Sequence, residues 1–174
     1  GTLKQGILRI EDEIEIKPGR IVKEANKYHY ETIKTKILNL FKGSKKVSKL
    51  TPGGSMSIET ELDMILGKGD ALSGNVVSLL GKLPELTQYL KLKYVLFPEV
   101  FGVNEKIKVE VVKHSELLML SVNTSTSGGT VVSIKGDEIE ISLRVPVVAF
   151  KGNNVGIARN VQGHWRLIGY GKII

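Results

Sequence analysis

The chain has 174 residues, of which 41% are hydrophobic and 25% are charged, close to the averages of globular proteins. These proportions exclude an intrinsically disordered chain, and no apolar run approaches the ~20 residues that a membrane-spanning helix needs. The chain has no cysteine, which excludes disulfides and thiolate chemistry, and its formal net charge of +7 favours partners that carry phosphate groups.

Short runs of alternating apolar and polar residues dominate the first half of the chain. Residues 12–17 alternate glutamate with isoleucine, and Lys17-Pro18-Gly19 predicts a turn that ends this strand. Residues 32–41 alternate in the same way, with Phe41 on the apolar face and lysines on the other face. Shorter alternating runs predict two further strands, at 56–60 and 76–80.

The second half shows the same pattern with more strands. Alternation predicts strands at 90–96, 107–111, 118–122, 130–134, 139–143, 155–158 and 165–174. A helical period is not sustained anywhere, and the segments 62–66 and 85–89 could each form only a turn or two of helix. Many short strands separated by turn residues are typical of barrels and sandwiches, so we predict an all-β fold.

Gly81-Lys82-Leu83-Pro84 divides the chain into halves of similar length and strand number. Proline cannot donate to a central β-ladder and therefore favours strand starts and connections. We predict two small closed β-barrels, residues 1–84 and residues 85–174, joined by a short linker. A single large sandwich is the alternative.

Positive charge is concentrated in one segment. Residues 17–49 contain ten lysines and arginines against two glutamates, whereas residues 50–90 contain two lysines against five acidic residues. Such asymmetry attracts phosphate backbones, although lysines also keep β-edges soluble. The glycine pairs Gly53-Gly54 and Gly128-Gly129 could present backbone amides to a phosphate, but such pairs are more often turns that need a positive φ.

Catalytic motifs are missing from the sequence. It has no Gly-x-x-x-x-Gly-Lys-Ser/Thr phosphate cradle, and it lacks the Asp-x-x-Gly and Asn-Lys-x-Asp motifs of translational GTPases. The three histidines are too scattered for a spaced set of metal ligands, and no Gly-x-Ser-x-Gly marks a nucleophile. We interpret the chain as a binding scaffold. An unrecognised enzyme on a β scaffold is the alternative, because catalytic triads assemble in space from distant residues.

Several segments carry a family resemblance. Residues 1–19 resemble the second domain of translational GTPases, and Thr51-Pro52-Gly53-Gly54, Gly74-Asn75-Val76-Val77 and Leu83-Pro84-Glu85 narrow the match. The most specific piece is Gly163-His164-Trp165-Arg166-Leu167-Ile168-Gly169-Tyr170-Gly171. Together these segments resemble the gamma subunit of eukaryotic and archaeal translation initiation factor two. Glu11 and Tyr170 depart from the family, which usually has glycine and tryptophan at these two positions.

This resemblance implies a non-catalytic role in translation initiation. The family's intact subunit uses GTP and magnesium to deliver methionyl initiator tRNA to the small ribosomal subunit. The GTP-binding domain and the first strand of the second domain are expected to be outside this chain, and the start at Gly1 fits a trimmed fragment. No cofactor is therefore expected here.

The implied partners are the alpha subunit, the initiator tRNA, the small ribosomal subunit and an assembly chaperone. No membrane partner is expected, and the implied location is the cytoplasm. The equivalent barrels of the selenocysteine-specific elongation factor are the alternative within the same fold.

By analogy with elongation factor Tu, the resemblance places the tRNA 3′ end near residues 41–54. The implied tRNA-binding residues are Phe41, Lys42, Lys45, Lys46, Pro52, Gly53 and Gly54. Lysines would neutralise phosphates, and Phe41 would either stack on a base or belong to the core.

In the second barrel, the residues implied in contacts with the ribosome or a partner protein are Arg159, His164, Trp165 and Arg166. The alternatives are that Trp165 packs in the core and that the two arginines form surface salt bridges. No catalytic or metal-binding residue is assigned.

Overall fold

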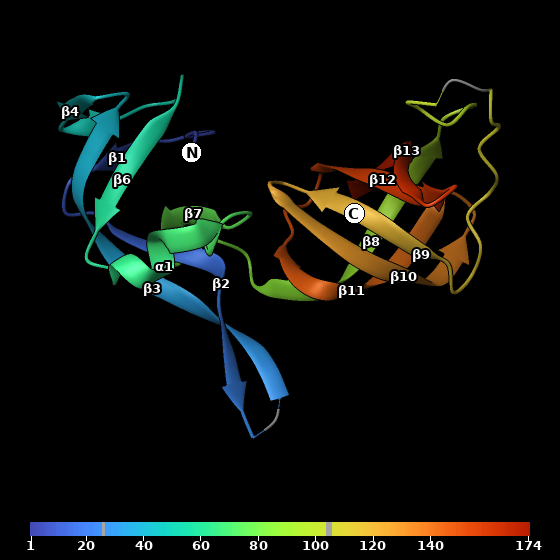
Figure 1. Ribbon diagram of the computed structural model, residues 1–174, viewed down its shortest axis with the longest axis horizontal. Coiled ribbons are helices and arrows are strands. Elements are labelled where there is room, and N and C mark those ends of the chain that lie inside the picture. The colour runs from blue at the N-terminus through green and yellow to red at the C-terminus, as the bar shows by residue number, and fades with distance from the viewer. Residues whose placement is uncertain (26, 104–105) are drawn as a thin grey trace. The chain divides into compact units, whose positions relative to one another are not determined.

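The computed structural model of the chain describes residues 1–25, 27–103 and 106–174. The chain divides into two compact units, which we call unit 1 (Gly1–Leu83) and unit 2 (Pro84–Ile174) (Figure 1). Nearly all regular structure is β, which confirms the predicted fold class. The described helices are the single turn α1 (Met64–Gly67) and the 3-10 turn η1 (Lys68–Asp70). In the described ranges, no helix is long and apolar enough to cross a membrane.

Unit 1 forms an open sheet. Its strands are β1 (Leu8–Arg9), β2 (Glu13–Glu24), β3 (Lys27–Lys42), β4 (Lys45–Val47), β5 (Lys49–Leu50), β6 (Met56–Thr60) and β7 (Val76–Leu79). The order is β4-β3-β2-β7, β6 also pairs with β3, and β1 pairs separately with β5. In the part of the chain that is described, β7 pairs only with β2 and does not close the sheet. The expectation of a closed barrel over residues 1–84 is therefore corrected to an open sheet.

The core of unit 1 is small and comes from both sheets. Its buried side chains are Leu8, Ile14, Ile37, Leu40 and Leu50. Leu8 and Leu50 are directly opposite in the β1–β5 pair, so this two-stranded sheet is held to the unit by its buried leucines.

The predicted turn at Lys17-Pro18-Gly19 is wrong, because β2 continues through these residues. The register against β3 shifts between Ile16 and Arg20, which places a β-bulge at this point. Gly19 has a φ of 88°, its amide donates to Asn75 Oδ1 at 2.7 Å, and a Cβ there would overlap the carbonyl of Glu31. Because the bulge interrupts the ladder, Pro18 needs no N–H to donate to β3, and Gly19 can adopt its positive φ. Beyond it, β2 and β3 continue as a two-stranded arm (Figure 1).

Unit 2 is a closed six-stranded barrel, as predicted for the second half of the chain. The order is β10-β11-β8-β13-β12-β9, and β9 pairs with β10 to close it. The strands are β8 (Leu86–Leu96), β9 (Leu117–Val122), β10 (Ser125–Lys135), β11 (Glu138–Val148), β12 (Asn154–Val161) and β13 (His164–Ile173). Alternate residues of these strands fill the interior, as at Leu90 and Leu92 of β8.

Two local predictions for unit 2 are corrected by the structure. Residues 85–89 are not helical, because β8 begins at Leu86. Residues 107–111 form no strand beyond the isolated bridge Glu99–Lys108, yet Val109 and Val112 are buried in the barrel core. The apolar alternation there marks a segment that packs on the core without a continuous ladder.

Gly128 and Gly129 lie inside β10, opposite Met119 and Leu118, so the turn interpretation of this pair is wrong. A Cβ on Gly129 would stand 2.5 Å from Ile141 Cγ2, which real structures do not tolerate. Gly129 therefore lets the Ile141 side chain of β11 lie close to the backbone of β10.

Candidate functional site

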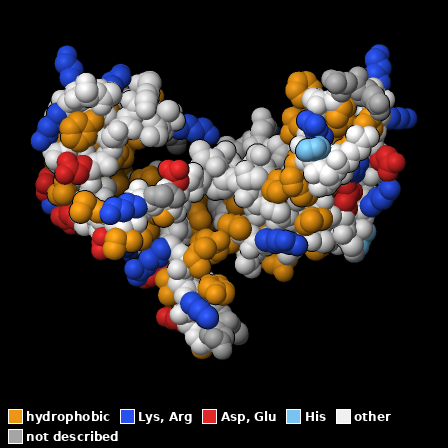
Figure 2. All heavy atoms as spheres, in the orientation of Figure 1, with side chains coloured by type: hydrophobic (Ala, Val, Ile, Leu, Met, Phe, Trp, Pro, Cys, Tyr) orange, Lys and Arg blue, Asp and Glu red, His pale blue; other side chains and the backbone are white. Residues whose placement is uncertain are grey.

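The lysine-rich segment of the sequence folds into the β3–β4 hairpin. Lys42 and Lys45 are directly opposite in the antiparallel register, and Phe41 is opposite Lys46. We call Lys42, Lys45 and Lys46 the basic hairpin. All three side chains are exposed, and none forms an ion pair with another residue in the described ranges. Figure 2 shows Lys and Arg side chains standing out from the end of unit 1 that contains β4.

The loop between β5 and β6 lies beside the basic hairpin. Gly53 and Gly54 have φ values of 120° and 81°, so both need glycine, and Pro52 precedes them in the exposed part of the loop. A Cβ on Gly54 would lie 3.8 Å from Lys42 Cε, whereas nothing lies within 4 Å of one on Gly53. The structure thus brings the predicted Pro-Gly-Gly loop next to a predicted lysine.

Phe41 is half-buried rather than part of the core. The register of β3 against β6 shifts between Ile37 and Asn39, which places a bulge at Leu38. The bulge reverses the alternation, so Leu40 is fully buried and Phe41 faces the other side. The predicted shared face of residues 33–41 therefore ends at Ile37, and Phe41 remains partly exposed.

This arrangement offers positive charge and backbone amides. The seven predicted tRNA-binding residues comprise lysines, glycines, a proline and a phenylalanine, with no carboxylate or imidazole among them. Lysine ammonium groups act as flexible point charges that suit phosphates without reading bases. The chemistry of the site is that of a polyanion-binding surface.

The two-stranded arm carries an apolar face that sequence reasoning missed. Ile21 is opposite Tyr30 and Lys23 is opposite Tyr28, so these four side chains share one face. Ile21 is 61% exposed and Tyr28 is 71% exposed, and Lys23 Nζ lies 5.7 Å from the centre of the Tyr28 ring. The alternation of residues after Gly19 could have predicted this face. It was not used, because a turn at Pro18-Gly19 was expected to end the strand.

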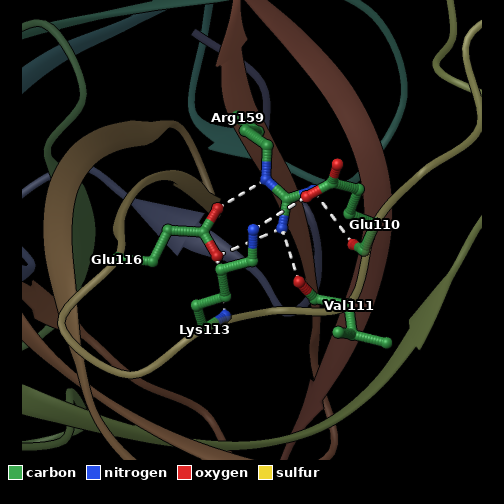
Figure 3. A network of polar contacts seen from close by, with 5 residues as sticks. All are labelled: Glu110, Val111, Lys113, Glu116 and Arg159. Atoms are coloured by element: carbon green, nitrogen blue, oxygen red, sulfur yellow. Dashed lines mark hydrogen bonds and ion pairs between the residues drawn. The ribbon is translucent and has the colours of Figure 1, made fainter.

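In unit 2, Arg159 is bound within a polar network (Figure 3). Its Nε and Nη2 donate to the Glu116 carboxylate at 2.5 and 3.1 Å, and both side chains are less than one-fifth exposed. Nη1 and Nη2 also donate to the carbonyls of Glu110 and Val111. Lys113 pairs with Glu110 at 2.8 Å, and this hydrogen bond and charge lower the pKa of Glu110. The network fastens residues 110–116 to β12. The alternative for Arg159 was a surface salt bridge, and the structure shows an ion pair that is largely buried.

The other three predicted residues of unit 2 begin β13. Trp165 is 40% exposed, so it does not fill the core as one alternative had it. His164 is exposed as well. Arg166 is half-buried opposite Arg159 in the register, and its Nε has no hydrogen-bond partner in the described ranges. The hairpin of β12 and β13 thus gathers all four predicted residues, and Arg159 is paired with Glu116, whereas Arg166 has no ion pair in the described ranges.

A buried charged pair near the end of unit 1 was also missed. Glu15 and Lys17 are 4% and 5% exposed and share one face of β2. The Leu83 amide donates to Glu15 Oε1 at 2.7 Å, and Lys17 Nζ lies 3.4 Å from the Leu83 carbonyl. The pair holds the backbone that leads out of unit 1, and the acidic-aliphatic alternation gave no sign of it.

Metal chemistry finds no support among the described side chains, which contain no group of three His, Cys, Asp or Glu residues able to hold an ion.

Comparisons with known proteins point to one family. Residues 88–173 match the family model described as "Initiation factor eIF2 gamma, C terminal". The chain is 45% identical over all its 174 residues to translation initiation factor 2 subunit gamma of Methanococcus maripaludis strain S2. The proteins of the same name from Methanocaldococcus jannaschii and Pyrococcus abyssi are 41% and 43% identical over 173 residues. In each case the match spans 42% of the relative's length.

Proposed function

Because this chain belongs to the gamma-subunit family of translation initiation factor 2, we propose that it is a non-catalytic binding module of translation initiation. Its proposed ligand is methionyl initiator tRNA, held through phosphates at its acceptor end by the basic hairpin and the adjoining Gly53-Gly54 loop. The observation that carries the proposal is a cross-strand pair of exposed lysines, Lys42 and Lys45, without a counter-ion in the described ranges.

Physical chemistry favours a nucleic-acid ligand at this site. Like charges directly opposite on paired strands destabilise a hairpin, so an anion that bridges them relieves the repulsion. Each phosphate neutralised by a lysine releases counter-ions, which strengthens binding at low salt. Phe41 is half-buried, and we propose that its exposed part adds a surface on which a terminal base can stack.

The test compares tRNA binding by the wild type and by Lys42→Gln/Lys45→Gln/Lys46→Gln. Affinity is measured by filter binding between about 50 and 200 mM salt. If three phosphate contacts to the single-stranded acceptor end are lost, the slope of log affinity against log salt falls by about 2. The matched control, Lys135→Gln/Lys151→Gln/Lys172→Gln, removes the same charge from exposed positions of unit 2 and should leave the slope unchanged. Equal slopes for the two triple variants would refute the proposal.

We further propose that the arm of β2 and β3 docks a protein partner, the alpha subunit. Support comes from the uncovered apolar face that contains Ile21 and Tyr28, since exposed aromatic and aliphatic side chains are typical anchors of protein interfaces. Ile21→Ser/Tyr28→Ser should abolish co-elution with the alpha subunit's C-terminal domain without changing tRNA binding. Retained co-elution would assign the interface elsewhere.

Unit 2 is proposed to contact the ribosome or an assembly chaperone through the start of β13. Support comes from Trp165 and His164, which are both exposed there. GTP and magnesium belong to the proposed activity of the intact subunit. The described residues do not fit them, because the phosphate cradle is missing from the sequence and no metal-ligand group is present.

A further inference from the structure

We propose that Arg9 and Lys49 form a second phosphate-binding point in unit 1, which extends the RNA surface of the basic hairpin onto the β1–β5 pair. This inference rests on the proposed tRNA-binding function. The sequence did not suggest it, because the two residues lie forty positions apart and only the fold pairs them.

The antiparallel register places Arg9 directly opposite Lys49. Leu8 and Leu50, the neighbouring pair in the same register, are both buried. Because successive side chains of a strand point to opposite faces, the arginine and the lysine must both face outward, and both are exposed. Two cations therefore stand side by side on the outer face of this short sheet.

Two acidic residues that follow Arg9 in the chain make other contacts. The Asp12 carboxylate accepts the backbone amide of Arg9 at 2.7 Å, and Glu11 pairs with Lys36. Neither Arg9 nor Lys49 has an ion pair with another residue in the ranges that the structure describes. A directly opposed pair of cations without a counter-ion weakens the sheet in the free protein. An external anion is the species that would stabilise it.

The Arg9–Lys49 pair lies close to the basic hairpin along the chain. Three residues of extended backbone span at most about 11 Å, which bounds the Cα separation of Lys46 and Lys49. Unit 1 thus has two cross-strand cation pairs, Arg9–Lys49 and Lys42–Lys45, joined by a short connection. Repeated cation pairs at this spacing suit a repeating polyanion better than a single carboxylate.

RNA backbone is the ligand that these features favour. Arginine binds phosphate oxygens through two parallel hydrogen bonds, and lysine adds a point charge. Contacts of this kind hold the phosphate backbone and do not read bases. We therefore expect Arg9 and Lys49 to contribute affinity without sequence preference.

The experiment measures the salt dependence of binding by fluorescence anisotropy. The probes are a labelled oligouridylate of about 12 nucleotides, within the range of single-strand binding sites, and a polyglutamate of equal charge. The proteins are the wild type, Arg9→Gln/Lys49→Gln, and the charge-matched control Lys34→Gln/Lys68→Gln from exposed positions elsewhere in unit 1. Arg9→Lys serves as the conservative variant that keeps the charge. Thermal melting checks that each variant is folded.

Loss of two phosphate contacts should lower the slope of log affinity against log salt by about 1.4 in Arg9→Gln/Lys49→Gln. The control and Arg9→Lys should keep the wild-type slope. If the wild type binds oligouridylate but the double variant keeps the full slope, the inference is overturned while the proposed function of the basic hairpin stands. If the wild type binds no RNA at low salt, the proposed function fails and takes the inference with it. Tighter binding of polyglutamate than of oligouridylate would overturn the assignment to RNA in favour of an acidic protein.

Discussion

Replacing Glu15 tests how the C-terminal end of unit 1, at Leu83, is held to β2. The carboxylate is 4% exposed and accepts the Leu83 amide, with further backbone hydrogen bonds from Gly81 and Lys82. Truncation in Glu15→Ala would leave the Leu83 amide without its acceptor and remove a charge that attracts Lys17, which should cost about 2–4 kcal/mol. Glu15→Gln keeps one carbonyl acceptor and should cost about 1–3 kcal/mol.

The same carboxylate should make stability depend on pH. Burial raises the pKa of Glu15, but the backbone amides of residues 81–83 and the charge of Lys17 outweigh burial and hold the pKa below its ordinary value of 4.5. A carboxyl group with a lowered folded-state pKa stabilises the folded state fully above about pH 5. That contribution is lost as the pH falls through the folded-state pKa. The free-energy difference between wild type and Glu15→Gln should therefore shrink in acid.

The assay is urea denaturation at several pH values between about 7 and 3, followed by far-UV circular dichroism. The fluorescence of Trp165, the sole tryptophan, reports on unit 2 alone. Hydrogen bonds from Lys113 and Lys93 also lower the pKa values of Glu110 and Asp137 in unit 2. These groups are the same in every variant, so the difference in unfolding free energy between wild type and variant isolates Glu15. Glu13→Gln, an exposed position of the same strand, is the matched control and should change stability by less than about 0.5 kcal/mol. Equal stability and equal pH slopes for Glu15→Gln and Glu13→Gln would refute the reasoning.

Three further outcomes are expected. Gly129→Ala should destabilise unit 2 by about 1–3 kcal/mol in urea melts read by tryptophan fluorescence, because its methyl group would meet Ile141. Gly128→Ala, whose nearest neighbour is Arg144 Cδ at 3.8 Å, should be tolerated, and equal effects would contradict the packing argument. Arg159→Ala should cost about 2–4 kcal/mol and speed amide exchange over residues 110–116, whereas Lys113→Ala, in an exposed pair, should cost at most about 1 kcal/mol. GTP with magnesium should leave the melting temperature of the chain unchanged, and a nucleotide-dependent rise would show a site that the described residues do not reveal.

The fold class followed from the sequence because alternation is a local property. Leu90 and Leu92 of β8 both fill the core, as the period of two required. Phe41 shows where that reasoning fails. The alternation predicted that Phe41 faces the core, but the bulge at Leu38 turns Leu40 into the core instead. A bulge forms where two particular strands meet, and the sequence of one strand does not contain that information.

The candidate site, too, could be predicted from the sequence only in part. The basic hairpin was proposed from its family resemblance, and its lysines are close in the chain because a short turn joins them. Arg159 could not be assigned, since its partner Glu116 is 43 residues away. The apolar face of the arm was missed for a different reason, because a proline and glycine that usually stop a strand here lie within one.

By itself, the sequence determined the all-β class and the excess of positive charge between residues 17 and 49. Tertiary structure alone decided that unit 1 stays open, that Glu15 and Lys17 are buried, and that Arg9 lies opposite Lys49. The physical reason is that each residue's own backbone sets the face to which its side chain points. The neighbour that the side chain meets is set by strand pairing, which depends on residues far away in the chain.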